Sequence, residues 1–257
     1  MSKLLIGPYI GNFKYEIEIF IPYVNYLLNV LDLSKFDDII ISSHINRKFL
    51  YKYPHTKFYP VYENITRNEL DQEGIVFNGI DKQQYLQIAK MIKSDIGGVK
   101  EQQMLSYIKN TNNIPRTQLI YNKFEYKYTK TDNIIFIPDK SKKCRELYDW
   151  LSHNNIKFSV IGNMNNGLAV YNDLLKKKNY FDIVYEYMFN GVHNSKFVLT
   201  PCSEWALICN LQKIPVLYWG DKCSLFKKNG MLWFNNKNNI SIRNFNLSMI
   251  KYMLKGE

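Results

Sequence analysis

The sequence contains, between residues 194 and 207, the run NSKFVLTPCSEWAL, followed between residues 213 and 220 by KIPVLYWG. Phe197–Leu199 is a short apolar run that leads into the small residues of Thr200–Ser203, which is typical of a buried strand entering a loop. A short helix is expected next, and Val216–Tyr218 is a second apolar run that ends at a glycine. A strand, a helix and a strand in close succession indicate a parallel sheet with crossover helices.

The same alternation of strands and helices runs through the rest of the chain. The sequence therefore predicts an α/β fold made of two Rossmann-like domains, residues 1–128 and 129–257, which would face each other across a cleft. Apolar runs predict strands over residues 4–6, 38–41, 58–61, 118–121, 134–137, 157–161, 197–199 and 216–218. Helices are expected over residues 14–31 (kinked or split at Pro22), 46–51, 83–93, 100–109, 141–153, 182–189, 203–211 and 247–254.

The composition narrows the classes of possible binding partner but does not select one. The 257 residues carry a formal net charge of +11, which arises from lysine and accompanies many Asn, Ile and Tyr residues that AT-rich codons encode. Such a genome bias explains a solvated basic surface, and it suits a large DNA virus, a bacterium or a protist equally. Binding of a phosphate by the clustered lysines is the alternative, while nucleic acid is disfavoured because the lysines are scattered.

Other residue types exclude several classes of protein. The four cysteines form no CxxC pair and the four histidines lie far apart, so free thiols in a reducing compartment and no metal site are expected. No apolar run approaches the roughly 20 residues of a membrane span. The N-terminus reaches Gly7-Pro8 too early to be a signal peptide, so a soluble, cytoplasmic protein (in the host cytoplasm if the source is viral) is expected.

Candidate ligand sites follow from the rule that parallel sheets bind ligands beyond the carboxyl ends of their strands. In the first half this rule selects the loop Gly7–Phe13, where Gly7, Tyr9, Gly11 and Asn12 would approach a ligand. An ordinary strand-to-helix turn is the alternative interpretation. Glu16 lies in the first turn of the next helix, where it is a candidate catalytic base or, alternatively, a group that suits the helix dipole.

The second half offers three such loops. Pro138–Lys143 joins a helix N-terminus, capped by Ser141, to the lysines Lys140, Lys142 and Lys143, so a bound phosphate would relieve their conflict with the helix dipole. Gly162 and Asn163 follow another strand, and Pro201, Cys202 and Ser203 follow Phe197–Leu199. Glu204 would accept hydrogen bonds from the hydroxyls of a ribose or sugar. A solvated lysine run and a capping glutamate are the alternatives.

The segment Phe197–Gly220 resembles the donor-site region of glycosyltransferases with the GT-B fold, in particular the heptosyltransferase-like group. That group has an apolar strand, a small-residue loop, a short helix containing alanine and a strand of the form giPv-x-l-x-G, which Ile214–Gly220 matches. The opening GPYIGNFKYE of residues 7–16 resembles the acceptor-side glycine loop of such enzymes. Two positions depart from the pattern: Pro201-Cys202-Ser203 replaces Asp-Ser-Gly, and Asn12 stands where an acidic residue is usual. The chain is also short for two full lobes, which is compatible with a reduced N-terminal lobe.

The resemblance implies a metal-independent enzyme without a cofactor, which moves a sugar from a nucleotide sugar to the hydroxyl of a glycan or other acceptor. Glu16 would be the base, and the loops of the second half would hold the donor. Two alternatives stay open: a non-catalytic α/β protein that binds nucleic acid or another polyanion, and a transferase of similar fold that moves a non-sugar group, such as a pyruvyl transferase.

Overall fold

The computed structural model describes residues 1–11, 13–61, 82–104, 118–124, 131–139, 141–161, 180–201, 203–220, 239–242 and 244–255. Two compact units make up the chain. Unit 1 comprises Met1–Glu125 and Lys178–Glu186, and unit 2 comprises Tyr126–Lys177 and Tyr187–Glu257. A single boundary after residue 128 was expected from the sequence, whereas unit 1 also takes in the segment Lys178–Glu186.

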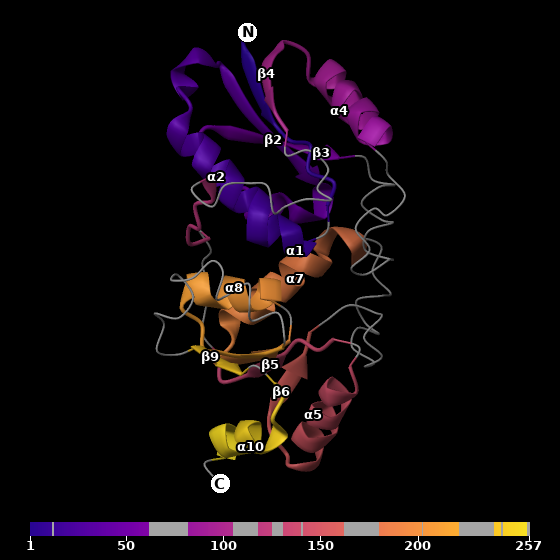
Figure 1. Ribbon diagram of the computed structural model, residues 1–257, viewed down its shortest axis with the longest axis vertical. Helices are drawn as coiled ribbons and strands as arrows, with labels where there is room; N and C mark the ends of the chain where they lie inside the picture. Colours follow the sequence, from indigo (N-terminus) through magenta and orange to yellow (C-terminus); the bar gives the residue numbers. More distant parts are fainter. Residues whose placement is uncertain are drawn as a thin grey trace. The chain divides into compact units, whose positions relative to one another are not determined.

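Unit 1 contains a sheet of four described strands, all parallel, in the order β3-β2-β1-β4, called sheet A below (Figure 1). The first strand lies in the middle, with β2 on one side and β4 on the other. The described elements of unit 1 are β1 Lys3–Ile6, α1 Phe13–Tyr15, η1 Glu16–Phe20 (a π-helical turn), α2 Ile21–Val30, η2 Leu33–Lys35 (3-10), β2 Asp38–His44, η3 Ile45–Leu50 (3-10), β3 Thr56–Val61, α4 Lys82–Ile96 and β4 Val99–Gln103.

Both faces of sheet A are buried. Leu5 and Ile40 pack against Tyr85 and Ile92 of α4 on one face. Their strand neighbours alternate to the opposite face, where α2 lies in Figure 1 and where Ile39 is buried. Burial on both faces explains why β1 and the first half of β2 are continuous apolar runs, whereas the edge strands β3 and β4 are mixed in composition and only partly buried.

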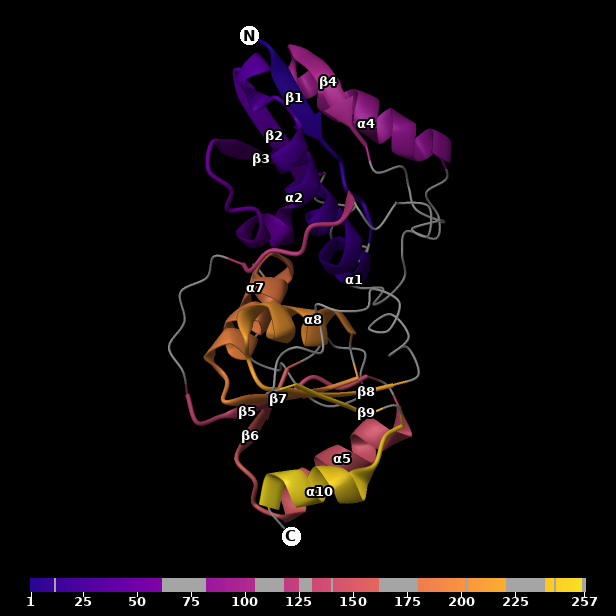
Figure 2. The same cartoon turned by 60° about the vertical axis from the view of Figure 1, so that its left-hand side comes forward.

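Unit 2 contains a sheet whose described strands, also all parallel, have the order β6-β5-β7-β8-β9, called sheet B. The helices α5 and α10 cover one face of it and α7 and α8 the other (Figure 2). Between sheet B and the helices α5 and α10 lies a hydrophobic core, in which Phe136, Leu199 and Leu217 of the strands pack with Leu147 and Ile250 of the helices. The described elements of unit 2 are β5 Ile134–Phe136, α5 Lys142–His153, β6 Phe158–Val160, α7 Tyr180–Asn194 (its first residues in unit 1), β7 Phe197–Thr200, α8 Ser203–Gln212, β8 Val216–Trp219, β9 Asn239–Ile242 and α10 Leu247–Lys255.

The α/β class and most elements are confirmed, and two are wrong. The predicted helix 100–109 begins as the strand β4, because Val99–Gln103 pairs in parallel with β1 and the glycines 97 and 98, both with positive φ, turn the chain back to the sheet. Residues 118–124 form no strand; instead, Ile120 donates its N–H to the carbonyl of Pro22 (3.0 Å) and accepts from Asn25 (2.8 Å). The strand β9 was not predicted.

Candidate functional site

The loop after β1 lies at the carboxyl edge of sheet A, and the protein itself already binds much of its backbone. Gly7 donates to the carbonyl of Gln103 (2.8 Å), and Tyr9 donates to the carbonyl of Ser42 (2.9 Å). Tyr85 donates its hydroxyl proton to the carbonyl of Pro8 (2.9 Å). These bonds tie the loop to β4, β2 and α4, so its position is fixed from three sides.

Packing explains the two glycines of this loop. Gly7 has φ +111°, and a Cβ there would lie 2.5 Å from the carbonyl oxygen of Ser42. A Cβ at Gly11 would lie 2.2 Å from the hydroxyl oxygen of Tyr9. The backbone at Gly7 therefore needs glycine, whereas at Gly11 a side chain would require the ring of Tyr9 to move. A contact between Gly7, Tyr9 or Gly11 and an acceptor stays a prediction, and Asn12 lies outside the described residues.

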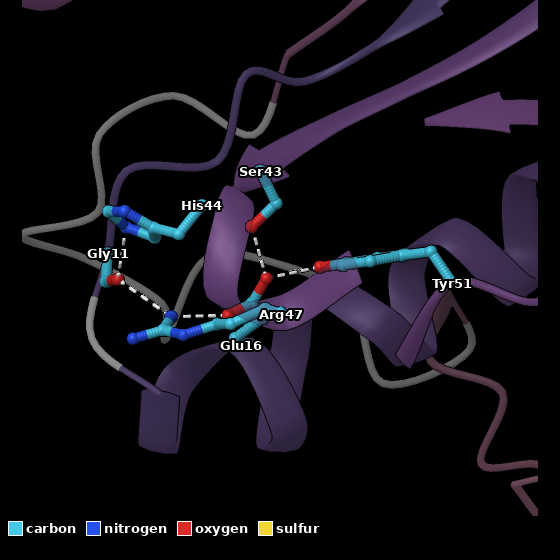
Figure 3. Close-up of polar contacts among 6 residues, drawn as sticks. All are labelled: Gly11, Glu16, Ser43, His44, Arg47 and Tyr51. Carbon is cyan, nitrogen blue, oxygen red and sulfur yellow. Dashed lines mark hydrogen bonds and ion pairs between the residues drawn. The ribbon is translucent and has the colours of Figure 1, made fainter. Parts of the chain in front are cut away.

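Glu16 is the centre of a buried polar cluster at the same edge (Figure 3). Its carboxylate accepts hydrogen bonds from the hydroxyls of Ser43 and Tyr51 and forms an ion pair with Arg47. The side chains of Glu16 and Arg47 are both 0 % exposed. The π-helical turn that begins at Glu16 follows α1, the short helix after the glycine loop. Ser43 comes from β2 and Arg47 from η3, and Tyr51 is the residue directly after η3.

Arg47 connects this carboxylate to the loop and to two aromatic rings. Its Nη1 donates to the carbonyl of Gly11 (3.2 Å) as well as to Glu16. The guanidinium carbon lies 5.4 Å from the ring centre of Phe13 and 5.0 Å from that of Tyr185, and these two rings stack on each other. Ring faces attract a cation most where water is absent, so the rings help to compensate the buried charge.

Burial changes the acid–base properties of the neighbouring side chains. His44 bonds the carbonyl of Gly11 through Nε2 (3.1 Å), and since a carbonyl only accepts, Nε2 carries the proton. Desolvation, and secondly the charge of Arg47, hold the pKa of His44 well below its usual 6.5, so the ring is neutral. Desolvation and the nearby carboxylate of Glu16 raise the pKa of Tyr51 well above 10.

Protein groups thus hold the carboxylate of Glu16, which lies in a first helical turn and does not face solvent. A base must offer a lone pair to its substrate, and here both oxygens accept from protein groups. The role of Glu16 as the base stays a prediction. The sequence analysis missed Ser43, His44, Arg47 and Tyr51, although the run Ser43–Arg47 after an apolar strand was a signal for a polar strand end.

In unit 2 the structure brings two of the predicted loops together at the carboxyl edge of sheet B. β5 and β7 are parallel neighbours, with Phe136 paired to Leu199, and Ile137 donates to the carbonyl of Leu199 (2.9 Å). The loops that follow them, beginning at Pro138 and Pro201, therefore start side by side. β5 has β6 on its other side, so this is the position where the strand order reverses, which is where open α/β sheets bind ligands.

The N-terminus of α5 is capped as predicted. The Ser141 hydroxyl accepts from the N–H of Cys144 (3.3 Å), and the carboxylate of Asp139 accepts from the N–H of Ser141 (2.9 Å). Lys142 and Lys143 are exposed, and no hydrogen bond from their backbone N–H groups is present in the described part of the chain. Burial, and secondly Asp139, raise the pKa of the Cys144 thiol to about 12.

The other predicted donor residues are only partly described. α8 begins at Ser203, directly after the loop that follows β7, and Glu204 is half-buried in its first turn. Lys140, Gly162, Asn163 and Cys202 lie outside the described residues, as does the side chain of Ser203. Cys144 and Cys209 are free, buried thiols.

Among the residues that the structure describes, no three His, Cys, Asp or Glu side chains gather where they could hold a metal ion. In the same part of the chain, no helix has the length and apolar character that crossing a membrane requires.

Comparison with known proteins adds a distant likeness. No protein-family model matches the sequence, and no curated protein matches it. Among solved structures, the chain is similar to the E. coli ADP-heptose LPS heptosyltransferase II, with 12 % identity, a TM-score of 0.48, and coverage of 95 % of this chain and 91 % of that one. A likeness at this level carries no inference about chemistry.

Proposed function

We propose that this protein is a GT-B-like glycosyltransferase whose unit 2 binds a nucleotide sugar at the carboxyl edge of sheet B. The adjacency of β5 and β7 supports the proposal, because it places the start of α5 and the start of α8 beyond neighbouring strand ends. Helix N-termini attract anions through their dipoles and their unpaired N–H groups. A diphosphate is the anion that bridges two such helix ends.

Each predicted residue has a role in this proposal. The diphosphate would lie against the backbone N–H groups and the side chains of Lys142 and Lys143, with Lys140, Ser141 and the loop Pro201–Ser203 beside it. Gly162 and Asn163, on the loop after the neighbouring strand, would border the donor. Glu204 would accept hydrogen bonds from ribose or sugar hydroxyls. The carboxylate of Asp139 already occupies one N–H, so the lysines must outweigh its repulsion.

Donor binding is tested by thermal unfolding in the presence of UDP-, GDP-, ADP- and CMP-linked sugars. A ligand at 100 times its dissociation constant stabilises a protein by about 2.7 kcal/mol. We expect a stabilisation of this size from one of these nucleotide sugars, without added metal. The double substitution Lys142→Ala and Lys143→Ala should remove most of that stabilisation.

The matched control removes two exposed lysines from the opposite edge of the same sheet: Lys157→Ala, before β6, and Lys196→Ala, before β7. Stabilisation by the donor should survive in this variant. Equal losses in both double variants, with a steep dependence on salt, would instead indicate general binding of polyanions. Stabilisation by no nucleotide sugar would refute the donor site, and turnover of the bound donor separates transfer of a sugar from transfer of another group.

We propose Glu16 as the base that deprotonates the acceptor hydroxyl, beside the loop of Gly7, Tyr9, Gly11 and Asn12. One hydrogen bond of its carboxylate must then open to admit the acceptor. Glu16→Gln should lower turnover by about 10²–10⁴ and leave stabilisation by the donor unchanged.

Because Glu16→Gln also disturbs a buried ion pair, the comparison is with Arg47→Met, which disturbs the same pair and retains the carboxylate. If Glu16 is the base, turnover should fall far more in Glu16→Gln than in Arg47→Met. Turnover is measured with both variants well below their unfolding temperatures. Equal losses would assign Glu16 a purely structural role.

A further inference from the structure

Unit 1 contains a cavity of about 460 Å³ at the amino end of sheet A, the end opposite the glycine loop. Its wall includes Leu28 of α2, Ile39 at the start of β2 and Phe36 just before that strand. The turn that leads into β3 contributes Tyr53 and His55, where His55 has φ +58°. The proposed transferase chemistry uses no residue of this cavity.

The cavity has the properties of a small-molecule site. Its volume falls in the range of about 300–1,000 Å³ that is usual for such sites, and aliphatic and aromatic side chains form most of its wall. Its polar lining residues are Asp37, His55 and Thr56, and the hydroxyl of Thr56 donates to the carbonyl of Tyr53 (3.0 Å). The hydroxyl of Tyr53 makes no hydrogen bond within the described part of the chain, and desolvation raises the pKa of this phenol, so it stays neutral.

The charge of the lining indicates which ligands are favoured. Asp37 is the carboxylate of the lining, with a side chain that is 60 % exposed, and the lining contains neither lysine nor arginine. Its Oδ2 accepts the N–H of Ser2 (2.5 Å) and lies 4.0 Å from the amino group of Met1. A carboxylate on the wall favours a cation over an anion, although the protein as a whole is basic.

We propose that this cavity binds a small organic cation, an ammonium group carried on a compact apolar body. The ammonium group lies at Asp37, where the rings of Phe36 and Tyr53 add the attraction of aromatic faces for a cation. The apolar body fills the space between Leu28 and Ile39, where its removal from water stabilises the complex.

Three probes of matched size test this proposal by calorimetric titration: 2-phenylethylamine, 2-phenylethanol and phenylacetate. The amine should bind at least tenfold more tightly than the alcohol, and phenylacetate should bind most weakly. Asp37→Asn should abolish the preference for the amine and leave binding of the alcohol unchanged. Asp32→Asn, which removes an exposed carboxylate outside the cavity, is the control and should change nothing.

Filling the cavity supplies the second test. Leu28→Trp should abolish binding of both the amine and the alcohol, and Leu33→Trp on the same wall replaces it if the first variant does not fold. Amine binding that persists in Asp37→Asn at full strength, or equal binding of phenylacetate, would overturn the proposal. So would the absence of saturable amine binding. Nucleotide sugars should stabilise all of these variants as they stabilise the parent protein, so the two proposals fail separately.

Discussion

At the scale of single residues, the buried ion pair of Glu16 and Arg47 shows that a candidate catalytic residue can also stabilise the fold. An unpaired charge in this position would cost several kcal/mol, because the ion loses its hydration. The structure compensates the pair with hydrogen bonds from Ser43 and Tyr51 and with the rings beside Arg47. Such a cluster fixes the glycine loop through the carbonyl of Gly11, whatever chemistry the loop performs.

The neutral state of His44 makes stability depend on pH. The pKa of this ring is depressed in the folded protein and is about 6.5 in the unfolded chain. Below pH 6.5 the unfolded chain therefore binds a proton that the folded protein does not, and the free energy of unfolding falls as the pH falls. Between pH 7 and pH 5 this one group should lower the free energy of unfolding by at most about 2 kcal/mol.

His44→Gln is the variant that isolates this effect, because its amide keeps a donor near the position of Nε2 and does not titrate. Urea unfolding followed by circular dichroism at pH 5, 6 and 7 should show a shallower loss of stability in this variant. Curves that run parallel to those of the parent protein would mean that the imidazole is protonated in the folded state.

At the scale of elements, Pro22 explains the π-helical turn. Proline has no N–H, so the carbonyl of Glu18 lacks the donor that an α-helix would supply four residues later. The hydroxyl of Tyr121 takes that place and donates to this carbonyl (2.8 Å). The segment 118–124, in which no strand forms, thus stabilises the interrupted helix.

Tyr121→Phe tests this account, because it removes the donor and keeps the ring. The free energy of unfolding should fall by about 1 kcal/mol, the usual contribution of one such hydrogen bond. Tyr252→Phe, at a hydroxyl on an exposed side chain of α10, should change it by less than about 0.5 kcal/mol in the same urea titration. Equal effects in the two variants would contradict the role of Tyr121.

Local signals in the sequence predicted most elements, and long-range pairing decided the others. Ser141 as an N-cap, the break at Pro22 and the apolar strands are visible in a few neighbouring residues. β4 is not, because the residues Lys100–Gln103 are good helix formers that form a strand only beside β1. The cluster around Glu16 was missed for a similar reason: its members are separated by up to 35 residues and meet only at the edge of the sheet.

At the scale of the whole molecule, the two units each have a complete core and a hydrogen-bonded sheet of their own. Units of this kind can unfold separately. The sequence supplies a convenient probe, because all 4 tryptophans (Trp150, Trp205, Trp219 and Trp233) belong to unit 2. Tryptophan fluorescence therefore follows unit 2, while far-UV circular dichroism follows both units.

One large-to-small substitution in each core makes the test quantitative. Leu147 and Ile92 are both fully buried, the first against the strands of sheet B and the second against those of sheet A. Shortening either to alanine should cost its own unit about 2–5 kcal/mol. Leu147→Ala should lower the urea midpoint seen by fluorescence. Ile92→Ala should leave that midpoint in place and lower only a circular-dichroism transition. If both variants shift both signals together, the units unfold as one cooperative structure and the two cores are energetically coupled.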